Sequence, residues 1–594
     1  MIVAADQGLS YGSIEWALTV LALVAPFAGA RLGGFIFVPV ERAFIALARR
    51  RGLAVLAVGL TELVLRLAML PVAPVPKPFV PDDFSFLLAA DTFAHGRLTN
   101  PTPTLWQHFE SLQIDMTPTY GSMYFPAQGL ALAAGKVLFG TPWAGLLIVS
   151  ALACAALCWM LQAWLPPGWA LLGGLMMVMR LGLFSYWINT YTGAGMIGAL
   201  GGALVLGAFP RLMRYTRHRD ALLLGAGIVI LALTRPYEGF LLCMPVLAVL
   251  LRWIWRGKNR PATGVLLRTA ALPLAMVIAA GAWMAYYDKQ AFGSPTTLPY
   301  TVNRQTYAMA PYYVWQNLRP EPHYRFREMR EFYYQDEVKA VWEIKKPMGL
   351  LFVSFKKTLG CIYFFSAVVL MPPLVMTRRV LKDRRVRFLV LALLIFAAGL
   401  SIEIFMIPHY LAPFTAVIYG LGLQALRHLR AWKLGGRRFG VGMARLLVTS
   451  CVVLCGVRVM AGPLQIHVQQ WPVGFWAGNW FGPDPDFGRP RAEMEAALER
   501  LPGKQLVLVR YEPTHEPMSE WVYNGADLEA AKVVWAREMD SADNKMLFDH
   551  YRGRRVWLVE PDANPPKIEP YPGLEGLAQR RGEFPANSDK GMGR

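Results

Sequence analysis

Apolar blocks long enough to cross a lipid bilayer recur along most of this 594-residue chain. The hydrocarbon core of a bilayer is about 30 Å thick, so a spanning helix needs about 20 mainly apolar residues. We expect helices over about 13–40, 53–72, 142–164, 168–186, 193–210, 220–235, 238–251, 266–286, 350–376, 388–407, 411–426 and 446–464. Only 17% of the residues are charged, whereas a soluble protein carries about 25%. The pattern excludes a soluble globular enzyme, a disordered chain and a fibrous protein.

Lysine and arginine residues gather beside these blocks. The chain has 60 of them against 40 acidic residues, a net charge of +20. Such a balance can indicate nucleic acid binding, but in a polytopic membrane protein it is typical of cytoplasmic loops. With twelve spans, the basic clusters after spans one, five, seven, nine and eleven all face the cytoplasm, and both termini lie outside. The block at about 126–140 must then not cross, and we expect it to be an interfacial amphipathic helix.

The predicted fold is mostly α, a polytopic membrane protein of about twelve transmembrane helices followed by a small C-terminal α/β domain. Residues 1–464 form the membrane body, and residues 465–594 form the outer domain. Two long segments of the body, a first loop at about 73–141 and a second loop at about 287–349, also face outward. In the tail we expect helices at 491–501 and 543–551, and strands at 505–511, 531–536 and 555–560. This alternation predicts a parallel sheet.

The sharpest local motif is Pro81-Asp82-Asp83, about ten residues after the second span. Two neighbouring carboxylates near a lipid interface raise the pKa of one of them through desolvation and mutual repulsion. Such a carboxylate can accept a proton from a hydroxyl that becomes a nucleophile. Proline and aspartate before a helix also cap its free backbone N–H groups. The residues alone favour capping and catalysis equally, and one aspartate can do each.

An acidic pair after an early span, a following helix with Tyr124-Phe125-Pro126-Ala127-Gln128-Gly129, and a body of many helices resemble the C-type (GT-C) glycosyltransferases. The nearest groups are those similar to dolichyl-phosphate-mannose protein mannosyltransferases and lipid A aminoarabinose transferases, over roughly residues 50–430. Members often have Asp-Glu at the acidic pair and Tyr-Pro-Pro near residue 125, so this match is partial. The resemblance implies Asp82 as catalytic base, with Asp83 as support or second choice.

The resemblance also implies the reaction. A polyprenyl-phosphate carrier would donate a sugar, with inversion, to a hydroxyl of a lipid, glycan or protein. The reaction would take place at the periplasmic face of a bacterial inner membrane, and the C-terminal domain would be periplasmic. Membrane lipids are expected partners and nucleic acid is not. No cofactor is certain, and a divalent cation such as Mg or Mn is permitted but not required.

Cations on the outer side would stabilise the charge of the leaving phosphate. Arg235 and Glu238 lie at the junction of two short spans, either as a functional pair or as a structural ion pair that fixes a hairpin. His409 ends a span as either an interfacial residue or a phosphate contact. The donor-phosphate candidates are Arg235, His409, Arg304 and Lys289. The substrate-binding candidates are Asp91, Tyr124, Gln128, Glu238 and Tyr410.

Three other classes of protein remain open. A lipid-linked glycan ligase or polymerase of another fold would depend on arginine and histidine in its outer loops rather than on an aspartate pair. A transporter or flippase would have polar residues within its spans and two similar halves. A scaffold for envelope assembly would depend mainly on the tail domain.

Overall fold

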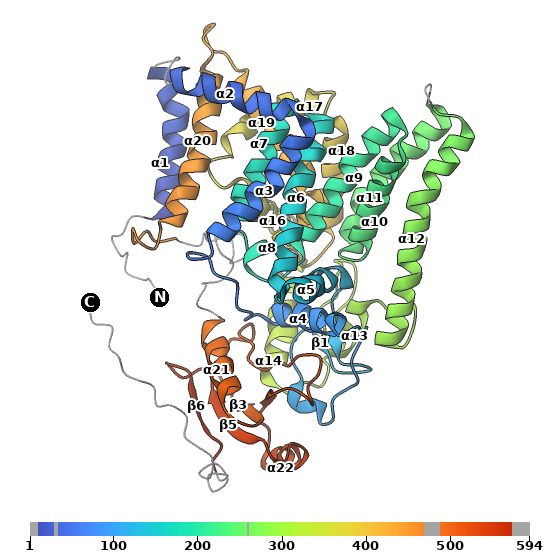
Figure 1. Ribbon diagram of the computed structural model, residues 1–594, viewed down its shortest axis with the longest axis vertical. Helices are drawn as coiled ribbons and strands as arrows, with labels where there is room; N and C mark the ends of the chain where they lie inside the picture. The colour runs from blue at the N-terminus through green and yellow to red at the C-terminus, as the bar shows by residue number, and fades with distance from the viewer. Residues whose placement is uncertain (1–9, 29–33, 258–259, 469–487, 573–594) are drawn as a thin grey trace.

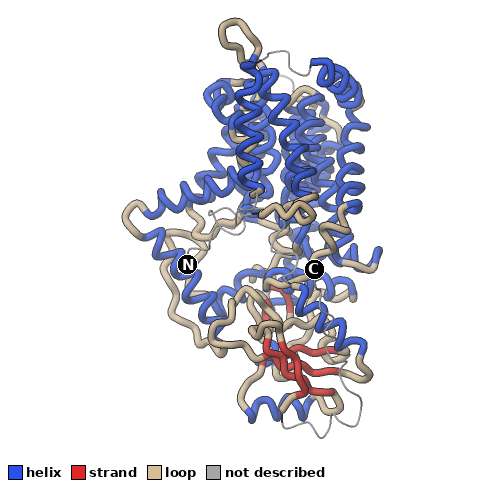
Figure 2. Tube along the Cα trace, turned by 90° about the vertical axis from the view of Figure 1, so that its left-hand side faces the viewer, coloured by secondary structure: helices blue, strands red, loops and turns tan. Residues whose placement is uncertain are grey.

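The protein is described by a computed structural model that covers residues 10–28, 34–257, 260–468 and 488–572. It consists of a helical bundle with a mixed region of helices, loops and a sheet at one end (Figure 1). Figure 2 shows the strands at the far end of this mixed region, away from the bundle.

Among the described residues, seven helices are long and apolar enough to cross a membrane. They are α1 (Tyr11–Ala28), α6 (Pro142–Trp164), α9 (Gly195–Tyr215), α11 (Pro236–Arg256), α12 (Thr263–Phe292), α16 (Gly349–Ser366) and α20 (Phe439–Val459). The other bundle helices are α3 (Arg51–Ala68), α7 (Pro167–Met177), α10 (His218–Ala232), α18 (Arg387–Ser401) and α19 (Thr415–Arg430). Each lies in an apolar block of the sequence, and the count of twelve spans stays a prediction.

Some predicted spans are not single α-helices, and two of these are instructive. The block at 13–40 forms α1 and a separate helix, α2 (Gly34–Arg49), while residues 29–33 lie outside the described residues. The block at 168–186 begins as α7, then continues as the π-helix η2 (Val178–Gly182) and the short helix α8 (Tyr186–Asn189). In this irregular stretch the Arg180 side chain donates to the carbonyls of Tyr363 and Phe364 at 2.9 Å, which ties it to the end of α16.

The two ends of the bundle carry different structures. Helices α2 and α17 (Thr377–Lys382) lie at one end (Figure 1). The opposite end, called here the loop end, carries α4 (Pro81–Ala94), α5 (Pro126–Phe139), α13 (Pro299–Tyr307) and α14 (Arg327–Arg330). Helix α5 is the helix predicted at 126–140. The remaining elements of the body are η1 (Trp106–Phe109), β1 (Ile114–Asp115), β2 (Gly121–Ser122), η3 (Glu331–Asp336), α15 (Glu337–Lys345), η4 (Pro372–Met376) and η5 (Pro408–Phe414).

The tail forms a four-stranded sheet in the order β4-β3-β5-β6. Strand β3 (Gln505–Val509) pairs in parallel with β4 (Val533–Arg537) and with β5 (Arg555–Glu560), as the alternation of helices and strands predicted. Strand β6 (Lys567–Pro570), which was not predicted, pairs antiparallel with β5. Helices α21 (Arg489–Arg500) and α22 (Ser541–His550) occupy the two predicted helical segments.

The sheet and the first loop share one hydrophobic core. Leu506 and Leu508 of β3 belong to the same buried cluster as Phe84 and Leu88 of α4, and Phe109 of the first loop. Burial of apolar surface contributes about 25 cal/mol per Å², so this shared core holds the tail against the loop end. The predicted domain boundary between residues 464 and 465 stays a prediction.

Candidate active site

Asp83 is one of the most buried charged residues of the loop end, with no exposed side-chain surface. Its Oδ1 atom accepts hydrogen bonds from the backbone N–H of Tyr191 at 2.9 Å and the hydroxyl of Thr192 at 2.8 Å. Its Oδ2 atom accepts a 3.4 Å bond from the N–H of Phe79. Burial raises the pKa of Asp83 to about 7, against the opposing effect of these bonds. Asp83 therefore fixes the start of α4 to the α8–α9 connection.

Asp82 differs from its neighbour because its side chain is partly exposed. The hydroxyl of Tyr124 donates to Oδ1 of Asp82 at 2.5 Å. Burial raises the pKa of Asp82 above its ordinary value, although Tyr124, the side-chain amide of Gln113 and the charge of Arg235 all act to lower it. A carboxylate with a raised pKa and an accessible oxygen can act as a general base.

Arg235 brings a buried positive charge to the same site. It lies between α10 and α11, and its side chain is buried. One guanidinium nitrogen donates to Glu238 at 2.8 Å and another donates to the carbonyl of Gly193 at 3.4 Å. The guanidinium stacks 4.3 Å from the centroid of the Tyr410 ring. Its Nε has no hydrogen-bond partner among the described residues. The predicted Arg235–Glu238 ion pair is therefore present, and the buried Nε–H is a donor for which the described residues supply no acceptor.

His409, on η5, is buried beside the same arginine. Its backbone N–H donates to the hydroxyl of Tyr186 at 3.0 Å, and that hydroxyl lies 2.9 Å from Nδ1 of His409. The hydroxyl accepts from the backbone, and its own proton can point at Nδ1, an arrangement that fits the tautomer with the ring proton on Nε2. Burial and the charge of Arg235 hold the pKa of His409 well below its ordinary value. His409 is thus a neutral hydrogen-bond donor.

Gly193 makes this arrangement possible. Its φ of +82° lies in the left-handed region, which favours glycine. A Cβ atom at this position would lie 2.3 Å from Nδ1 of His409. The sequence Thr190-Tyr191-Thr192-Gly193 interrupts an apolar stretch. A polar interruption of this kind is a signal that could have pointed to the site, and the sequence interpretation missed it.

Aromatic side chains from both loops form one wall of the site. Tyr124 stacks on Phe86 at 4.3 Å and meets Tyr300 edge-on at 5.7 Å. Tyr300 also meets Tyr312 at 6.2 Å. Tyr300 and Tyr312 line a pocket of about 210 Å³ whose other walls include Arg304 and Arg319. This pocket is not lined by Asp82 itself, and Tyr300 connects it to the Tyr124 side chain that binds Asp82.

Arg304 is held within this wall. It forms an ion pair with Glu337 at 2.5 Å and donates to the carbonyl of Ala310 at 2.5 Å. Its guanidinium lies 5.0 Å from the centroid of the Tyr312 ring. The structure thus places the predicted Arg304 beside the pocket, with two of its donor groups already bound.

The structure brings Asp82, Asp83, Tyr124, Arg235, Glu238, His409 and Tyr410 together, but not every predicted residue. Asp91 forms an ion pair with Lys136 and accepts a 2.7 Å bond from the N–H of Ala526 in the tail. Gln128 donates to the carbonyl of Tyr191 at 3.2 Å and so contacts the residue whose N–H binds Asp83. Lys289 is exposed in the last turn of α12.

No known protein-family profile matches the chain, and its sequence matches no curated protein. Solved structures with a related arrangement include the oligosaccharyltransferase of Archaeoglobus fulgidus in complex with Zn and sulfate. It is 13% identical, has a TM-score of 0.45, and the match covers 85% of this chain and 67% of that one. ArnT from Cupriavidus metallidurans is 13% identical, with a TM-score of 0.45 and coverage of 88% and 94%.

An oligosaccharyltransferase of the same archaeon, AglB, has also been solved with an inhibitory peptide and a dolichol-phosphate. That structure is 11% identical, has a TM-score of 0.38, and the match covers 84% of this chain and 69% of that one. AglB and ArnT are both C-type glycosyltransferases, the group that the sequence resembles. The likeness is loose, and we base the proposed function on the side chains described above.

Proposed function

We propose that the protein is a membrane glycosyltransferase that moves a sugar from a polyprenyl-phosphate carrier to a hydroxyl acceptor. The observation that carries this proposal is the partly exposed carboxylate of Asp82 within electrostatic reach of the buried guanidinium of Arg235. A base and an anion-binding cation in one site fit a reaction in which a hydroxyl attacks and a phosphate leaves. The reaction takes place at the loop end, which we propose faces the periplasm of a bacterial cell.

The proposed reaction is a single displacement with inversion at the anomeric carbon. The acceptor oxygen forms a bond to that carbon while Asp82 takes the hydroxyl proton. The bond from the anomeric carbon to the phosphate oxygen breaks, and its electron pair stays with the phosphate. Arg235 and the Nε2–H of His409 stabilise the negative charge that develops there. Tyr124 keeps Asp82 oriented through its 2.5 Å hydrogen bond.

A divalent cation stays a prediction. Among the described residues, no group of three or more His, Cys, Asp or Glu side chains could hold a metal ion. Mg²⁺ is often bound by one or two carboxylates together with the phosphate oxygens of a substrate. Asp82 offers one such carboxylate, whereas both oxygens of Asp83 already accept hydrogen bonds.

The deciding experiment compares wild type with Asp82→Asn in transfer from a radiolabelled pool of polyprenyl-phosphate sugars. We expect transfer to fall at least about a hundredfold, as is usual when a general base is lost. Asp549→Asn is the matched control, because Asp549 lies on the surface of α22 and forms an ion pair with the exposed Arg552. Full transfer by Asp82→Asn would remove the proposal.

The same assay separates the alternative classes. A ligase or polymerase that depends on arginine and histidine would keep its activity in Asp82→Asn and lose it in His409→Ala. A transporter or scaffold would give no transfer in wild type. Reporter fusions after residues 215 and 500 test the orientation of the bundle, and a cytoplasmic signal at 500 would contradict the periplasmic face.

A further inference from the structure

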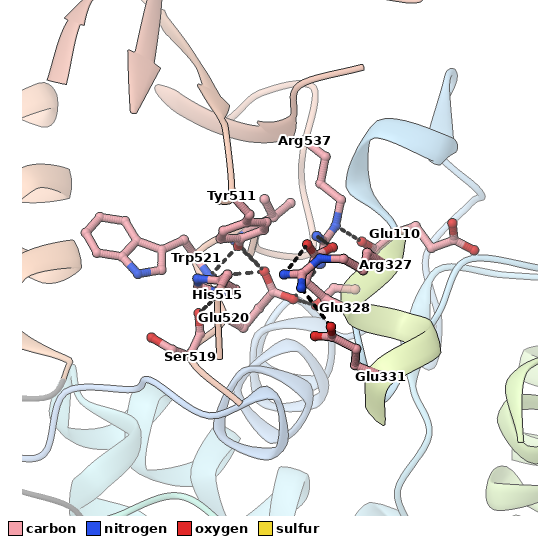
Figure 3. Close-up of polar contacts among 12 residues, drawn as sticks. Glu110, Arg327, Glu328, Glu331, Tyr511, His515, Ser519, Glu520, Trp521 and Arg537 are labelled. Carbon is pink, nitrogen blue, oxygen red and sulfur yellow. Dashed lines mark hydrogen bonds and ion pairs between the residues drawn. The ribbon is translucent and has the colours of Figure 1, made fainter. Parts of the chain in front are cut away.

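A buried polar cluster joins the tail to both long loops at a distance from the candidate active site. Its centre is Arg537, at the end of β4, whose side chain is 2% exposed. The Nε of Arg537 donates to the carbonyl of Glu110 at 2.7 Å. Its two terminal nitrogens donate to Glu520 at 2.9 Å and to Glu328 of α14 at 3.2 Å. Figure 3 shows the guanidinium between these groups of the tail, the first loop and the second loop.

Glu520 completes the cluster from the tail side. Its Oε1 accepts bonds from the hydroxyl of Tyr511 at 2.6 Å and from the backbone N–H groups of Trp521 and Val522. Its Oε2 accepts the bond from Arg537 and a 3.0 Å bond from the hydroxyl of Ser111. Every oxygen of this buried carboxylate is therefore used, and two residues of the first loop, Glu110 and Ser111, are held directly.

Residues 110–113, which Arg537 and Glu520 bind, contact α4 close to Asp82. Residues 110–113 are all buried, and Gln113 has a φ of +62°, a left-handed conformation that is unfavourable for any residue except glycine. The carbonyl of Gln113 accepts a 2.7 Å bond from the hydroxyl of Ser85, one turn after Asp82 on α4. A residue in such a conformation persists only when its surroundings fix it.

Two side chains that act on the Asp82 carboxylate, those of Tyr124 and Gln113, belong to the first loop. The Tyr124 hydroxyl donates to Asp82 at 2.5 Å, and the Gln113 amide acts to lower the pKa of Asp82. Ser122 links the two, because its hydroxyl lies 2.8 Å from that of Ser85 and accepts a 3.1 Å bond from the N–H of Tyr124. Glu110 and Ser111 lie only two or three residues before Gln113. A displacement of Glu110 and Ser111 would therefore disturb the contacts that position Asp82.

We propose that Arg537 and Glu520 of the tail are positioning residues that hold residues 110–113 in the conformation in which the Gln113 carbonyl binds Ser85, one turn after Asp82 on α4. The catalytic meaning of this contact rests on the proposed function, whereas the mechanical link does not. The tail is then a part of the active-site framework rather than an independent binding module.

The test uses Arg537→Lys in the full-length, detergent-solubilised protein. Lysine keeps the charge but cannot bind three separate groups in the planar geometry of arginine. Ser111→Ala is the second variant, because it removes one bond to Glu520 without leaving a buried charge unpaired. Arg510→Met is the control, since Arg510 directly follows β3 of the same sheet and its ion pairs, with Glu538 and Glu560, stay within the tail.

The first measurement, amide hydrogen exchange, is independent of activity. Peptides covering residues 108–124 should exchange faster in Arg537→Lys and Ser111→Ala than in wild type, and at the wild-type rate in Arg510→Met. Unchanged exchange in both test variants would overturn the mechanical link. This outcome does not depend on Asp82, so failure of the proposed function and failure of this inference remain distinguishable.

The second measurement is the pH dependence of transfer. Arg537→Lys should lower kcat about tenfold or more with KM within about twofold, since small misplacements of catalytic groups have effects of this size. The acid limb of the kcat profile should move to higher pH, because the Gln113 amide that favours the charged carboxylate is displaced. A higher KM with an unmoved acid limb would instead identify a role in binding and overturn the positioning role.

Discussion

The site around Asp82 and the cluster around Arg537 are both built from buried charges, but they differ in how completely those charges are bonded. Each of the three guanidinium nitrogens of Arg537 and both oxygens of Glu520 have a partner within the protein. At the candidate active site Asp82 is partly exposed, and the Nε of Arg235 has no partner among the described residues.

This difference in bonding distinguishes a cluster that stabilises the fold from a site that can bind a ligand. A fully bonded buried charge has little left to offer a ligand, and its removal leaves other groups unpaired. A buried charge with an unpaired donor carries a desolvation cost that a bound ligand can relieve. Substitution of a fully bonded charge should therefore lower stability, and substitution of a charge with an unpaired atom should lower turnover.

The largest expected effect on turnover is at Arg235. We expect the double variant Arg235→Met with Glu238→Gln to lower kcat about a hundredfold to a thousandfold, the range for loss of one charge-stabilising donor. Changing both members avoids a buried, unpaired Glu238 carboxylate. Steady-state transfer kinetics measure the effect, and a thermal melt near that of wild type is the control. A kcat within threefold of wild type would contradict an anion-binding role.

The matching change in the other cluster is Glu520→Gln. We expect it to destabilise the folded protein by about 3 kcal/mol, the lower part of the range for breaking a buried ion pair, because Glu328 still faces Arg537. Thermal or denaturant unfolding of the purified protein measures this. Asp549→Asn should cost less than about 1 kcal/mol, since it breaks an exposed pair. An equal loss of unfolding free energy in the two variants would contradict a structural role of the Arg537 cluster.

The sequence predicted those parts that local patterns determine. The apolar blocks give the bundle helices, and alternating segments in the tail give α21, β3, β4, α22 and β5. Strand β6 was missed because its sequence, Lys567-Ile568-Glu569-Pro570, is the polar pattern of an edge strand rather than an apolar run.

The candidate site was predicted in position but not in detail. The pair Asp82-Asp83 could be located, yet the division of labour between them depends on Tyr191 and Thr192, more than 100 residues away. Gln113 has no local signal at all, since its role comes from a contact across the first loop. Long-range packing of this kind leaves no trace in periodicity or spacing.

A smaller effect is expected at Gly193, which connects the backbone of the site to its histidine. Gly193→Ala would place a methyl group 2.3 Å from Nδ1 of His409 and would hold alanine at a φ of +82°. We expect kcat to fall about tenfold as His409 is displaced. The comparison variant is Gly96→Ala, also at positive φ (+70°) but with no atom within 4 Å of the added carbon. Equal activity in both variants would show that His409 tolerates displacement.

The smallest expected effect is a shift in pH dependence in Tyr124→Phe. The Tyr124 hydroxyl lowers the pKa of Asp82, whose net shift from burial is upward, so removing the hydroxyl should raise that pKa further. A base must be deprotonated, so the acid limb of the kcat/KM profile should move to higher pH, with a loss at neutral pH of several-fold. Rates from pH 4 to 9 measure this shift. The Asp82→Asn variant should show no such limb, and a limb that stays in place in Tyr124→Phe would mean that another group than Asp82 titrates.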